Sequence, residues 1–321
     1  MIKLGLLGAG MMGNVHTEML TKIPGVEVIA ISKIKEQQLE RIQKHLPEIK
    51  YYKNEEEFFS AGIKVVDITL PTFLHKEYIE KALLHGLDVI CEKPLCLTLQ
   101  EADEILNLNE KVDNNVYIAH VIRFWPEYIY LKKCLESGRL GRLRSMYMGR
   151  YTGLPDWSVD DWIVNRQLSG ATPLDLQIHD VDFVLYALGM PDDVQCKVLE
   201  NRLHIWTQYF YEPDTIVMME AGNDLPAAFG FEMNYRAVFE DGMLLFNSSG
   251  DHGLIEITDQ SRKINLSEQS EAQLERHLPS GNGYLTELAH FIDCIRKKIP
   301  SEYISVKSAA HTVQMILKYL S

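Results

Sequence analysis

The sequence predicts two domains: an α/β domain with a doubly wound parallel sheet, then an α+β domain with a largely antiparallel open sheet. Three observations support this. The chain has 321 residues, which is long for a single core. Its first 120 residues alternate apolar strands with helices, and from about residue 194 to 257 strand follows strand. We therefore expect domains at 1–120 and 121–321.

The first domain opens with an apolar strand that runs directly into a glycine turn. Residues 2–7 form the strand, and Gly8–Gly13 reads G-x-G-x-x-G before a helical pattern. In such a turn the first glycine makes the bend, the second admits a pyrophosphate, and the third allows close helix–strand contact. The helix start offers N–H groups and a positive dipole end to the anion. A Rossmann dinucleotide site is expected, with a structural glycine turn as the alternative; its predicted pyrophosphate contacts are Gly8, Gly10, Met11 and Met12.

The rest of this domain continues the alternation. Further strands are expected at Val26–Ile31, Tyr51-Tyr52, Val65–Thr69, Val89–Cys91 and Val116–Ala119. Helices are expected at Glu36–Leu46, Lys76–His85 and Leu99–Leu108. Gly86 follows the second of these helices in the position where a positive φ is needed. Continuous apolar strands between helices indicate a parallel sheet covered on both faces.

The second domain has a different pattern. Helices are expected at Pro126–Glu136 and Asp175–Leu188, both on one face of the sheet. The expected strands are Leu143–Tyr151, Val194–Leu199, Leu203–Phe210, Ile216–Ala221, Ala227–Tyr235 and Leu244–Phe246, with turns at Asp241-Gly242 and Gly250-Asp251. Residues 258–282 are expected to form a loop or a mobile segment, and two helices, Tyr284–Lys297 and Val306–Leu320, follow.

Composition excludes several classes of partner and site. The formal net charge of −13 argues against a nucleic acid or an anionic membrane as partner. No apolar run approaches the roughly 18–20 residues that span a bilayer. We expect no signal peptide, because no charged region with a long apolar run stands before the first strand. The five cysteines are scattered without a C-x-x-C pair, which indicates a reducing compartment and no zinc site or disulfide framework. We expect a cytoplasmic protein without a metal site.

The end of the second strand bears on the choice of cofactor. About 20 residues past the glycine turn, an acid normally binds the adenosine ribose of NAD. This chain has Ser32 and Lys33 there, with Lys35 close by. A hydroxyl and a cation suit a 2′-phosphate, which favours NADP over NAD. The alternative is a solvated lysine after a strand.

A second group of candidate residues follows the strand Val65–Thr69, at the carboxyl edge where ligands bind in such sheets. Thr72 is expected to cap the following helix. His75 either contributes to the cofactor site or has only a structural role at the helix start. The predicted cofactor contacts in this loop are Pro71, Thr72 and His75.

The tripeptide Glu92-Lys93-Pro94 directly follows the strand Val89–Cys91. Pro94 keeps Lys93 out of the helical region, so the side chain projects from an extended loop. Partial desolvation and a neighbouring positive nicotinamide both lower the pKa of a lysine and make it a usable acid or base. The alternative is a surface Glu–Lys pair. We predict that Glu92 and Lys93 contact the cofactor.

The helix that begins at Asp175 carries a possible acid–base pair. Asp175 and His179 are four residues apart and share a face, and Asp182 is expected beside His179. A carboxylate next to a histidine fixes the ring and tunes its pKa. A surface i,i+4 pair is the alternative.

Taken together, these motifs resemble the Gfo/Idh/MocA oxidoreductases. The resemblance runs nearly end to end, through Gly8–Gly13 with His16, Pro71 and His75, Glu92-Lys93-Pro94, Arg123-Phe124-Trp125-Pro126, Gly138 and Gly141, Asp175 to Asp182, and the Tyr284 helix. It implies an NAD(P)-dependent dehydrogenase or reductase acting on a sugar, cyclitol or related polyol, and a homodimer or homotetramer formed through the open sheet. By position, Lys93, Asp175 and His179 match the catalytic trio of the family. The Lys-Pro bond is cis in some members.

The chain departs from the family near the expected substrate. Gly170-Ala171-Thr172-Pro173 replaces a run of glycines, and Gln177 stands where glycine is common. Four residues, Trp157, Asp160, Asp161 and Trp162, either line a sugar site or form a packed loop with an acidic rim. The predicted substrate contacts are Arg123, Trp162, Asp175 and His179.

Two other functions are compatible with the same motifs. A dinucleotide-binding sensor would bind without turnover, although it has no need of an intact Lys93, Asp175 and His179. A glycosidase that recycles tightly held NAD would form product without net cofactor consumption, and Ser32-Lys33 counts against it because a recycled cofactor is usually NAD.

Overall fold

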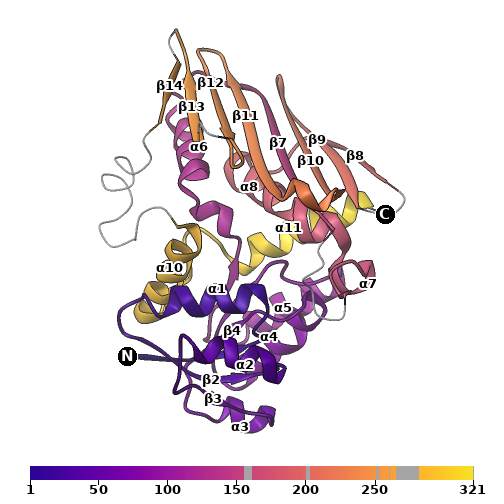
Figure 1. Ribbon diagram of the computed structural model, residues 1–321. Coiled ribbons are helices and arrows are strands. Elements are labelled where there is room, and N and C mark those ends of the chain that lie inside the picture. Colours follow the sequence, from indigo (N-terminus) through magenta and orange to yellow (C-terminus); the bar gives the residue numbers. More distant parts are fainter. Residues whose placement is uncertain (155–160, 200–202, 251–252, 260, 265–281, 321) are drawn as a thin grey trace. The chain divides into compact units, whose positions relative to one another are not determined.

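The computed structural model describes residues 1–154, 161–199, 203–250, 253–259, 261–264 and 282–320 (Figure 1). The chain forms two compact units, and each is described by itself. Of the described residues, the first contains Met1–Val121, Asp161, Trp162 and Asn282–Gln314, and the second contains the rest. The domain prediction placed all of 121–321 in the second domain, so the assignment of Asn282–Gln314 is a difference.

The first unit is built on a parallel sheet, as predicted. Its strands are β1 (Ile2–Leu7), β2 (Val26–Ser32), β3 (Lys50–Tyr51), β4 (Val65–Ile68), β5 (Asp88–Glu92) and β6 (Val116–Ala119). They pair in the order β3-β2-β1-β4-β5-β6, every pair parallel. Strands β1 to β3 extend the sheet toward one edge, and β4 to β6 extend it toward the other, so the strand order reverses between β1 and β4. Open α/β sheets bind ligands at such a switch point.

Helices surround this sheet. They are α1 (Met11–Leu20), α2 (Glu36–Gln43), α3 (Glu55–Phe59), α4 (His75–Leu84), α5 (Leu99–Asn109), α10 (Gly283–Lys297) and α11 (Val306–Leu320). The part of α11 from Met315 onward belongs to the second unit. Helix α10 packs beside α1 (Figure 1). The Tyr117 ring of β6 lies 5.3 Å from Phe291 of α10, and the Tyr117 hydroxyl donates to Ile299 O. Because these apolar and polar contacts tie it to the sheet, α10 belongs to the first unit.

The prediction that Thr72 caps a helix is wrong. A short 3₁₀ turn, η1 (Thr72–Leu74), precedes α4, and the residue before α4 is Leu74. Thr72 is buried instead. The predicted positive φ at Gly86 is confirmed, at 70°.

The second unit contains an eight-stranded sheet, β14-β13-β12-β11-β7-β10-β9-β8. Its strands are β7 (Leu143–Gly153), β8 (Asp193–Val198), β9 (His204–Tyr211), β10 (Thr215–Leu225), β11 (Phe231–Phe239), β12 (Met243–Asn247), β13 (Gly253–Ile257) and β14 (Ser261–Lys263). Among the strands that the structure describes, only β7 and β10 pair in parallel, so the predicted, largely antiparallel sheet is confirmed.

Two strand predictions in this sheet need correction. Ala227–Phe229 is a 3₁₀ turn, η5, and β11 begins at Phe231 because Gly230 turns the chain with a φ of 79°. Strand β14 lies in the stretch predicted as a loop; of that stretch, 260 and 265–281 lie outside the described residues, as does Asp251 of the second predicted turn. The turn at Asp241-Gly242 is confirmed, since Phe239 N–H donates to Gly242 O over 2.8 Å.

The helical segments of the second unit include α6 (Pro126–Ser137), α7 (Arg166–Ser169), η4 (Pro173–Gln177) and α8 (Ile178–Leu188). It also contains η2 (Val121–Phe124) from Ile122 onward. The Tyr128 ring of α6 lies 5.0 Å from Phe183 of α8 and 5.4 Å from Tyr235 of β11. It also lies 6.1 Å from Phe246 of β12. This aromatic cluster places α6 and α8 on one face of the sheet, as predicted.

Candidate active site

The three glycines of the first turn differ sterically. A Cβ on Gly8, whose φ is 92°, would lie 2.8 Å from Thr69 O, and one on Gly13 would lie 2.7 Å from Gly8 O. A Cβ on Gly10 would meet no atom within 4 Å. Gly8 and Gly13 are therefore required by the protein itself, whereas Gly10 keeps an open space free. That space suits the close approach of a pyrophosphate.

The start of α1 faces the same turn. Gly10 is the N-cap, no side chain caps the helix, and its first turn has no acidic residue. Met11 is exposed and Met12 half-buried. Thr69 Oγ1, at the end of β4, lies 3.1 Å from Leu7 O and 3.2 Å from Gly8 O and fixes the turn against the neighbouring strand. These residues fit the phosphates of a dinucleotide, which helix N-termini attract.

The residues predicted to determine the preference for NAD or NADP lie at the end of β2. Ser32 is buried, and its hydroxyl donates to Tyr52 O over 2.8 Å. Lys33 forms an ion pair with Glu55, which also accepts from Lys81 over 2.6 Å and from the Tyr78 hydroxyl over 2.9 Å. Burial would raise the pKa of Glu55, but these bonds outweigh it and lower the pKa to about 2. The Lys33 ammonium therefore lies beside a carboxylate that stays ionised.

The loop after β4 holds His75 in a structural arrangement. Its Nδ1 lies 2.7 Å from Pro94 O and its Nε2 lies 2.9 Å from Leu70 O. Burial lowers the pKa of His75. Both ring nitrogens face backbone carbonyls, so the ring joins two loops at the edge of the sheet. This geometry favours the structural alternative for its side chain, while Pro71 beside it is half-buried.

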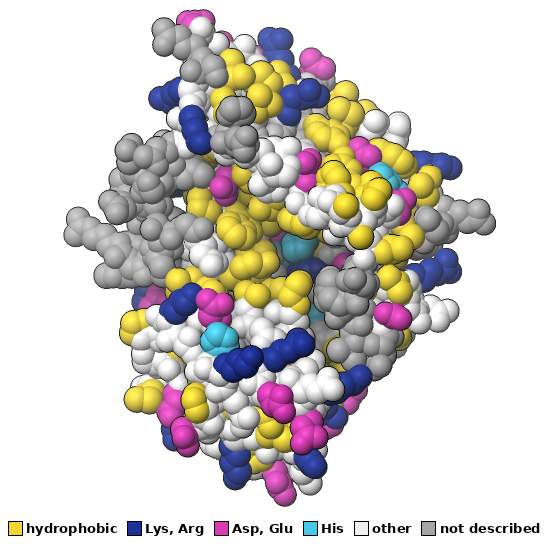
Figure 2. Space-filling model, viewed as in Figure 1, with side chains coloured by type: hydrophobic (Ala, Val, Ile, Leu, Met, Phe, Trp, Pro, Cys, Tyr) yellow, Lys and Arg dark blue, Asp and Glu magenta, His cyan; other side chains and the backbone are white. Residues whose placement is uncertain are grey.

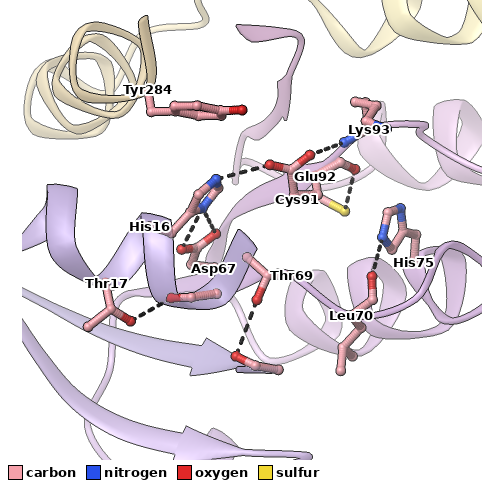
Figure 3. A network of polar contacts seen from close by, with 12 residues as sticks. His16, Thr17, Asp67, Thr69, Leu70, His75, Cys91, Glu92, Lys93 and Tyr284 are labelled. Atoms are coloured by element: carbon pink, nitrogen blue, oxygen red, sulfur yellow. Dashed lines mark hydrogen bonds and ion pairs between the residues drawn. The ribbon is translucent and has the colours of Figure 1, made fainter. Parts of the chain in front are cut away.

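Three charged side chains from α1, β4 and β5 meet in the first unit, as Figure 3 shows. His16 of α1 is fully buried, with Nδ1 3.0 Å from both carboxylate oxygens of Asp67 in β4. Its Nε2 lies 3.1 Å from Oε1 of Glu92, at the end of β5. Burial alone would lower the pKa of His16, but the two carboxylates raise it well above 6.5. The predicted cofactor residue Glu92 is thus part of a buried ion network.

Lys93 follows β5 in a loop and is half-buried. Its backbone N–H donates to Glu92 Oε2 over 3.1 Å. The Lys93–Pro94 peptide bond is cis. The first unit therefore carries Lys93 at the carboxyl edge of its sheet, where the sequence predicted it.

Asp175 and His179 belong to the second unit, and both are half-buried. Asp175 lies in η4, a π-helical turn that runs directly into α8 before His179. The helix predicted from Asp175 onward is therefore π-helical in its first turn. Such turns occur often at functional sites.

Asp182, which is predicted to lie beside His179, forms an ion pair with Arg123. Its carboxylate accepts from Arg123 Nε over 2.7 Å and from Arg123 Nη2 over 2.6 Å, and both side chains are buried. The Tyr186 ring lies 4.5 Å from the same guanidinium. Arg123, predicted to bind substrate, thus holds α8 against η2. The sequence could not reveal this, because Arg123 and Asp182 are 59 residues apart.

The other residues near α8 bond within the second unit. Asp180 pairs with Arg150 of β7 over 2.9 and 3.1 Å. Gln177, one of the departures from the family pattern, accepts from Thr207 Oγ1 over 3.0 Å and donates to Met219 O over 3.3 Å. Its side chain anchors η4 to β9 and β10, a position that a glycine could not fill.

Trp162, another predicted substrate contact, is half-buried and follows the exposed Asp161. Trp157 and Asp160 lie outside the described residues.

Three residues of the first unit were not predicted as site residues from the sequence: His16, Asp67 and Thr69. The signal for Asp67 was present, since a charged residue in the otherwise apolar strand β4 needs a buried partner. His16 was noted only as part of the motif.

Among the described residues, no group of His, Cys, Asp or Glu has the geometry of a metal site. Within the same residues, no helix has the length and apolar character of a membrane span. On the face drawn in Figure 2, basic and acidic side chains are interspersed.

A parallel sheet in this strand order, with a glycine turn beside its switch point, defines a dinucleotide-binding protein of the Rossmann class. Residues 2–120 match the family model described as an oxidoreductase family with an NAD-binding Rossmann fold. Residues 128–244 match the GFO/IDH/MocA C-terminal domain. The chain belongs to the GFO/IDH/MocA family of oxidoreductases.

Similar proteins include two inositol dehydrogenases. The chain is 28% identical to myo-inositol 2-dehydrogenase of Thermotoga maritima, over 59% of this chain and 55% of that protein. It thus spans about half the length of that relative. It is 26% identical to inositol 2-dehydrogenase of Arthrobacter sp., over 78% of this chain and 75% of that protein. A solved structure of levoglucosan dehydrogenase with NADH and levoglucosan has the same fold, with a TM-score of 0.84 at 17% identity, covering 99% and 96% of the two chains.

Proposed function

We propose that this protein is an NAD(P)-dependent dehydrogenase or reductase that acts on a CH–OH carbon of a cyclitol, sugar or related polyol. The observation that carries this proposal is the position of Lys93. It follows β5 at the carboxyl edge of the sheet whose glycine turn keeps an open space at Gly10. The similarity to inositol 2-dehydrogenases over 78% of the chain supports the polyol class.

The proposed roles divide between the two units. Lys93 and His179 share the hydroxyl proton, which one of them accepts as the alcohol becomes a carbonyl. Asp175 orients the histidine or binds a substrate hydroxyl. A bound nicotinamide ring supplies the hydride acceptor. Positioned acid–base groups of this kind contribute about 10²–10⁴-fold to the rate.

For the cofactor we propose NADP. Lys33 and Lys81 share Glu55, so a 2′-phosphate could replace that carboxylate as the partner of Lys33. Arrival of the phosphate would exchange one charge-assisted bond for another. NAD is the alternative, in which Lys33 stays with Glu55.

For the assembly we propose a homodimer or homotetramer formed through the sheet of the second unit. Trp206, Ile216 and Phe231 on three of its strands are exposed at 40%, 41% and 51%. Exposed apolar side chains on one element are typical of association surfaces. We also keep the cytoplasm as the proposed location, since all five cysteines are free thiols.

The experiment that tests the function begins with titration of the purified protein with NADPH and with NADH, followed by cofactor fluorescence. A panel of inositols and sugars is then added, and absorbance at 340 nm is recorded. We expect turnover of one polyol class by the wild type. Lys93→Ala should keep the Kd for the cofactor within about threefold and lose turnover by about 10²-fold or more.

The matched control is Lys64→Ala, which removes an exposed lysine of the same unit. Near-normal turnover by Lys93→Ala would rule out the proposed role of that residue. Tight cofactor binding without turnover of any polyol would favour a sensor. Product without net change of the cofactor would favour a glycosidase that recycles it.

A further inference from the structure

One buried imidazole joins the dinucleotide-binding turn to the loop that carries Lys93. His16 lies on α1, in the turn of helix that follows Gly13. Its two nitrogens reach Asp67 and Glu92, which stand on the neighbouring strands β4 and β5 (Figure 3). The side chain is 0% exposed, so water does not compete for either contact.

The chemistry of these contacts assigns the protonation state. Both partners of the ring are carboxylates, which accept hydrogen bonds. An imidazole donates from both nitrogens only when it is protonated. The raised pKa of His16 agrees with this, and the charge of His16 in turn lowers the pKa of Glu92 against the opposing effect of burial.

Glu92 transmits this restraint to the next residue. Its Oε1 accepts from His16, and its Oε2 accepts from the backbone N–H of Lys93 over 3.1 Å. One carboxylate therefore uses one oxygen for the helix and the other for the loop. Loss of the His16 bond would free the Glu92 side chain to rotate. The backbone N–H of Lys93 would then lose its hydrogen bond to the Glu92 carboxylate.

We propose that His16 is a positioning residue: a charged bridge from the glycine-turn helix to Glu92 that fixes the backbone from which Lys93 projects. This inference rests on the proposed function of Lys93. His16 itself is too deeply buried to touch a substrate. It acts through Glu92, and it makes the placement of Lys93 depend on the helix that receives the dinucleotide.

The bridge also sets the local charge. One imidazolium and two carboxylates leave a net charge of −1 in the buried network. Three other titratable groups face this network: Cys91 beside Glu92, His75 of α4, and Lys93 itself. Loss of the imidazolium would leave the two carboxylates without the positive charge that compensates them.

The test uses His16→Gln in the full-length protein, with His45→Gln as the matched control. His45 is an exposed histidine of the same unit. Imidazole ¹⁵N spectra of the wild type at pH 8 should show His16 doubly protonated. The backbone amide resonance of Lys93 should shift in His16→Gln and stay in place in His45→Gln. Neither readout needs a substrate.

Kinetics separate positioning from mere stability. We expect His16→Gln to lower kcat about 10–10²-fold, because small displacements of a reacting group have effects of that size. The Kd for the cofactor should change far less than kcat. Glu92→Gln, which keeps the shape and removes the charge, should shift the same Lys93 amide if His16→Gln does not fold.

A neutral His16 in the wild type at pH 8 would overturn the inference. So would an unmoved Lys93 amide in a folded variant. Full turnover by Lys93→Ala would instead overturn the proposed function, and the amide shift would still report on the bridge.

Discussion

Arg123 and Asp182 form a two-bond ion pair, with N–O distances of 2.7 and 2.6 Å and side chains exposed at only 3% and 0%. The pair ties η2 to the helix that carries His179. Removal of one partner leaves the other charge buried without compensation, which costs about 3–5 kcal/mol in comparable proteins. We expect Arg123→Ala to lower the free energy of unfolding by that amount, measured by urea denaturation.

Lys22→Ala is the control for this prediction. Lys22 pairs with Glu18 over 2.8 Å, but both side chains are nearly half exposed, so the loss should be below about 1 kcal/mol. Equal losses in the two variants would show that burial of the Arg123 pair has no special effect. A raised KM for substrate with unchanged stability would restore Arg123 to the substrate site.

The glycine turn offers a pair of substitutions with opposite outcomes. Gly10→Ala meets no protein atom within 4 Å, so the protein should fold normally. The new methyl group should occupy the space kept for the pyrophosphate and raise the Kd for NADPH and NADH at least about tenfold, a loss of 1.4 kcal/mol. Cofactor fluorescence measures this loss.

Gly13→Ala is the structural counterpart. Its Cβ would lie 2.7 Å from the backbone oxygen of Gly8, which cannot move without opening the turn. We expect a loss of stability of about 1–3 kcal/mol. If Gly10→Ala bound cofactor as tightly as the wild type, the open space at Gly10 would have no role in binding.

The proposed preference for NADP depends on Lys33. Lys33→Ala should raise the Kd for NADPH about tenfold more than the Kd for NADH, because one charge-assisted hydrogen bond contributes about 1.5–3 kcal/mol. Glu55→Gln removes the competing carboxylate and should tighten NADPH binding. Lys44→Ala, at an exposed position after α2, serves as the control. Parallel changes for both cofactors in Lys33→Ala would argue for NAD.

The buried network predicts a pH dependence of stability. The pKa of His16 is raised above its unfolded value of 6.5, so its contribution is complete below pH 6.5 and is lost as pH rises through the folded pKa. The pKa of Glu92 is lowered from 4.5, so its contribution is complete above pH 4.5 and is lost as pH falls through its folded pKa. Stability from this pair is therefore greatest between these limits.

Melting temperatures from pH 5 to pH 10 test this dependence. The wild type and His45→Gln should lose stability on the alkaline side, whereas His16→Gln should lose less there because the titrating imidazole is absent. Identical alkaline slopes in all three proteins would contradict the assigned charge on His16.

The elements that the sequence predicted best are those with strong local signals. The exact bounds of β6 follow from a four-residue apolar run between polar segments. The start of α6 follows from Pro126 at its first position. Two local predictions failed, the cap at Thr72 and the first residues of β11. Thr72 has the chemistry of a cap but is buried in a 3₁₀ turn, and β11 starts at Phe231 because Gly230 turns the chain.

The sequence by itself determined the order of elements, the glycine turn and the positions of Lys93, Asp175 and His179 along the chain. These depend on apolar periodicity and on residue chemistry at short range, which are written in consecutive residues. Only the tertiary structure decided that His16 bridges Asp67 and Glu92, and that Arg123 belongs to Asp182. The partners are 51 to 76 residues apart in the sequence. A buried charge requires a partner close in space, and no local sequence pattern encodes which residue that is.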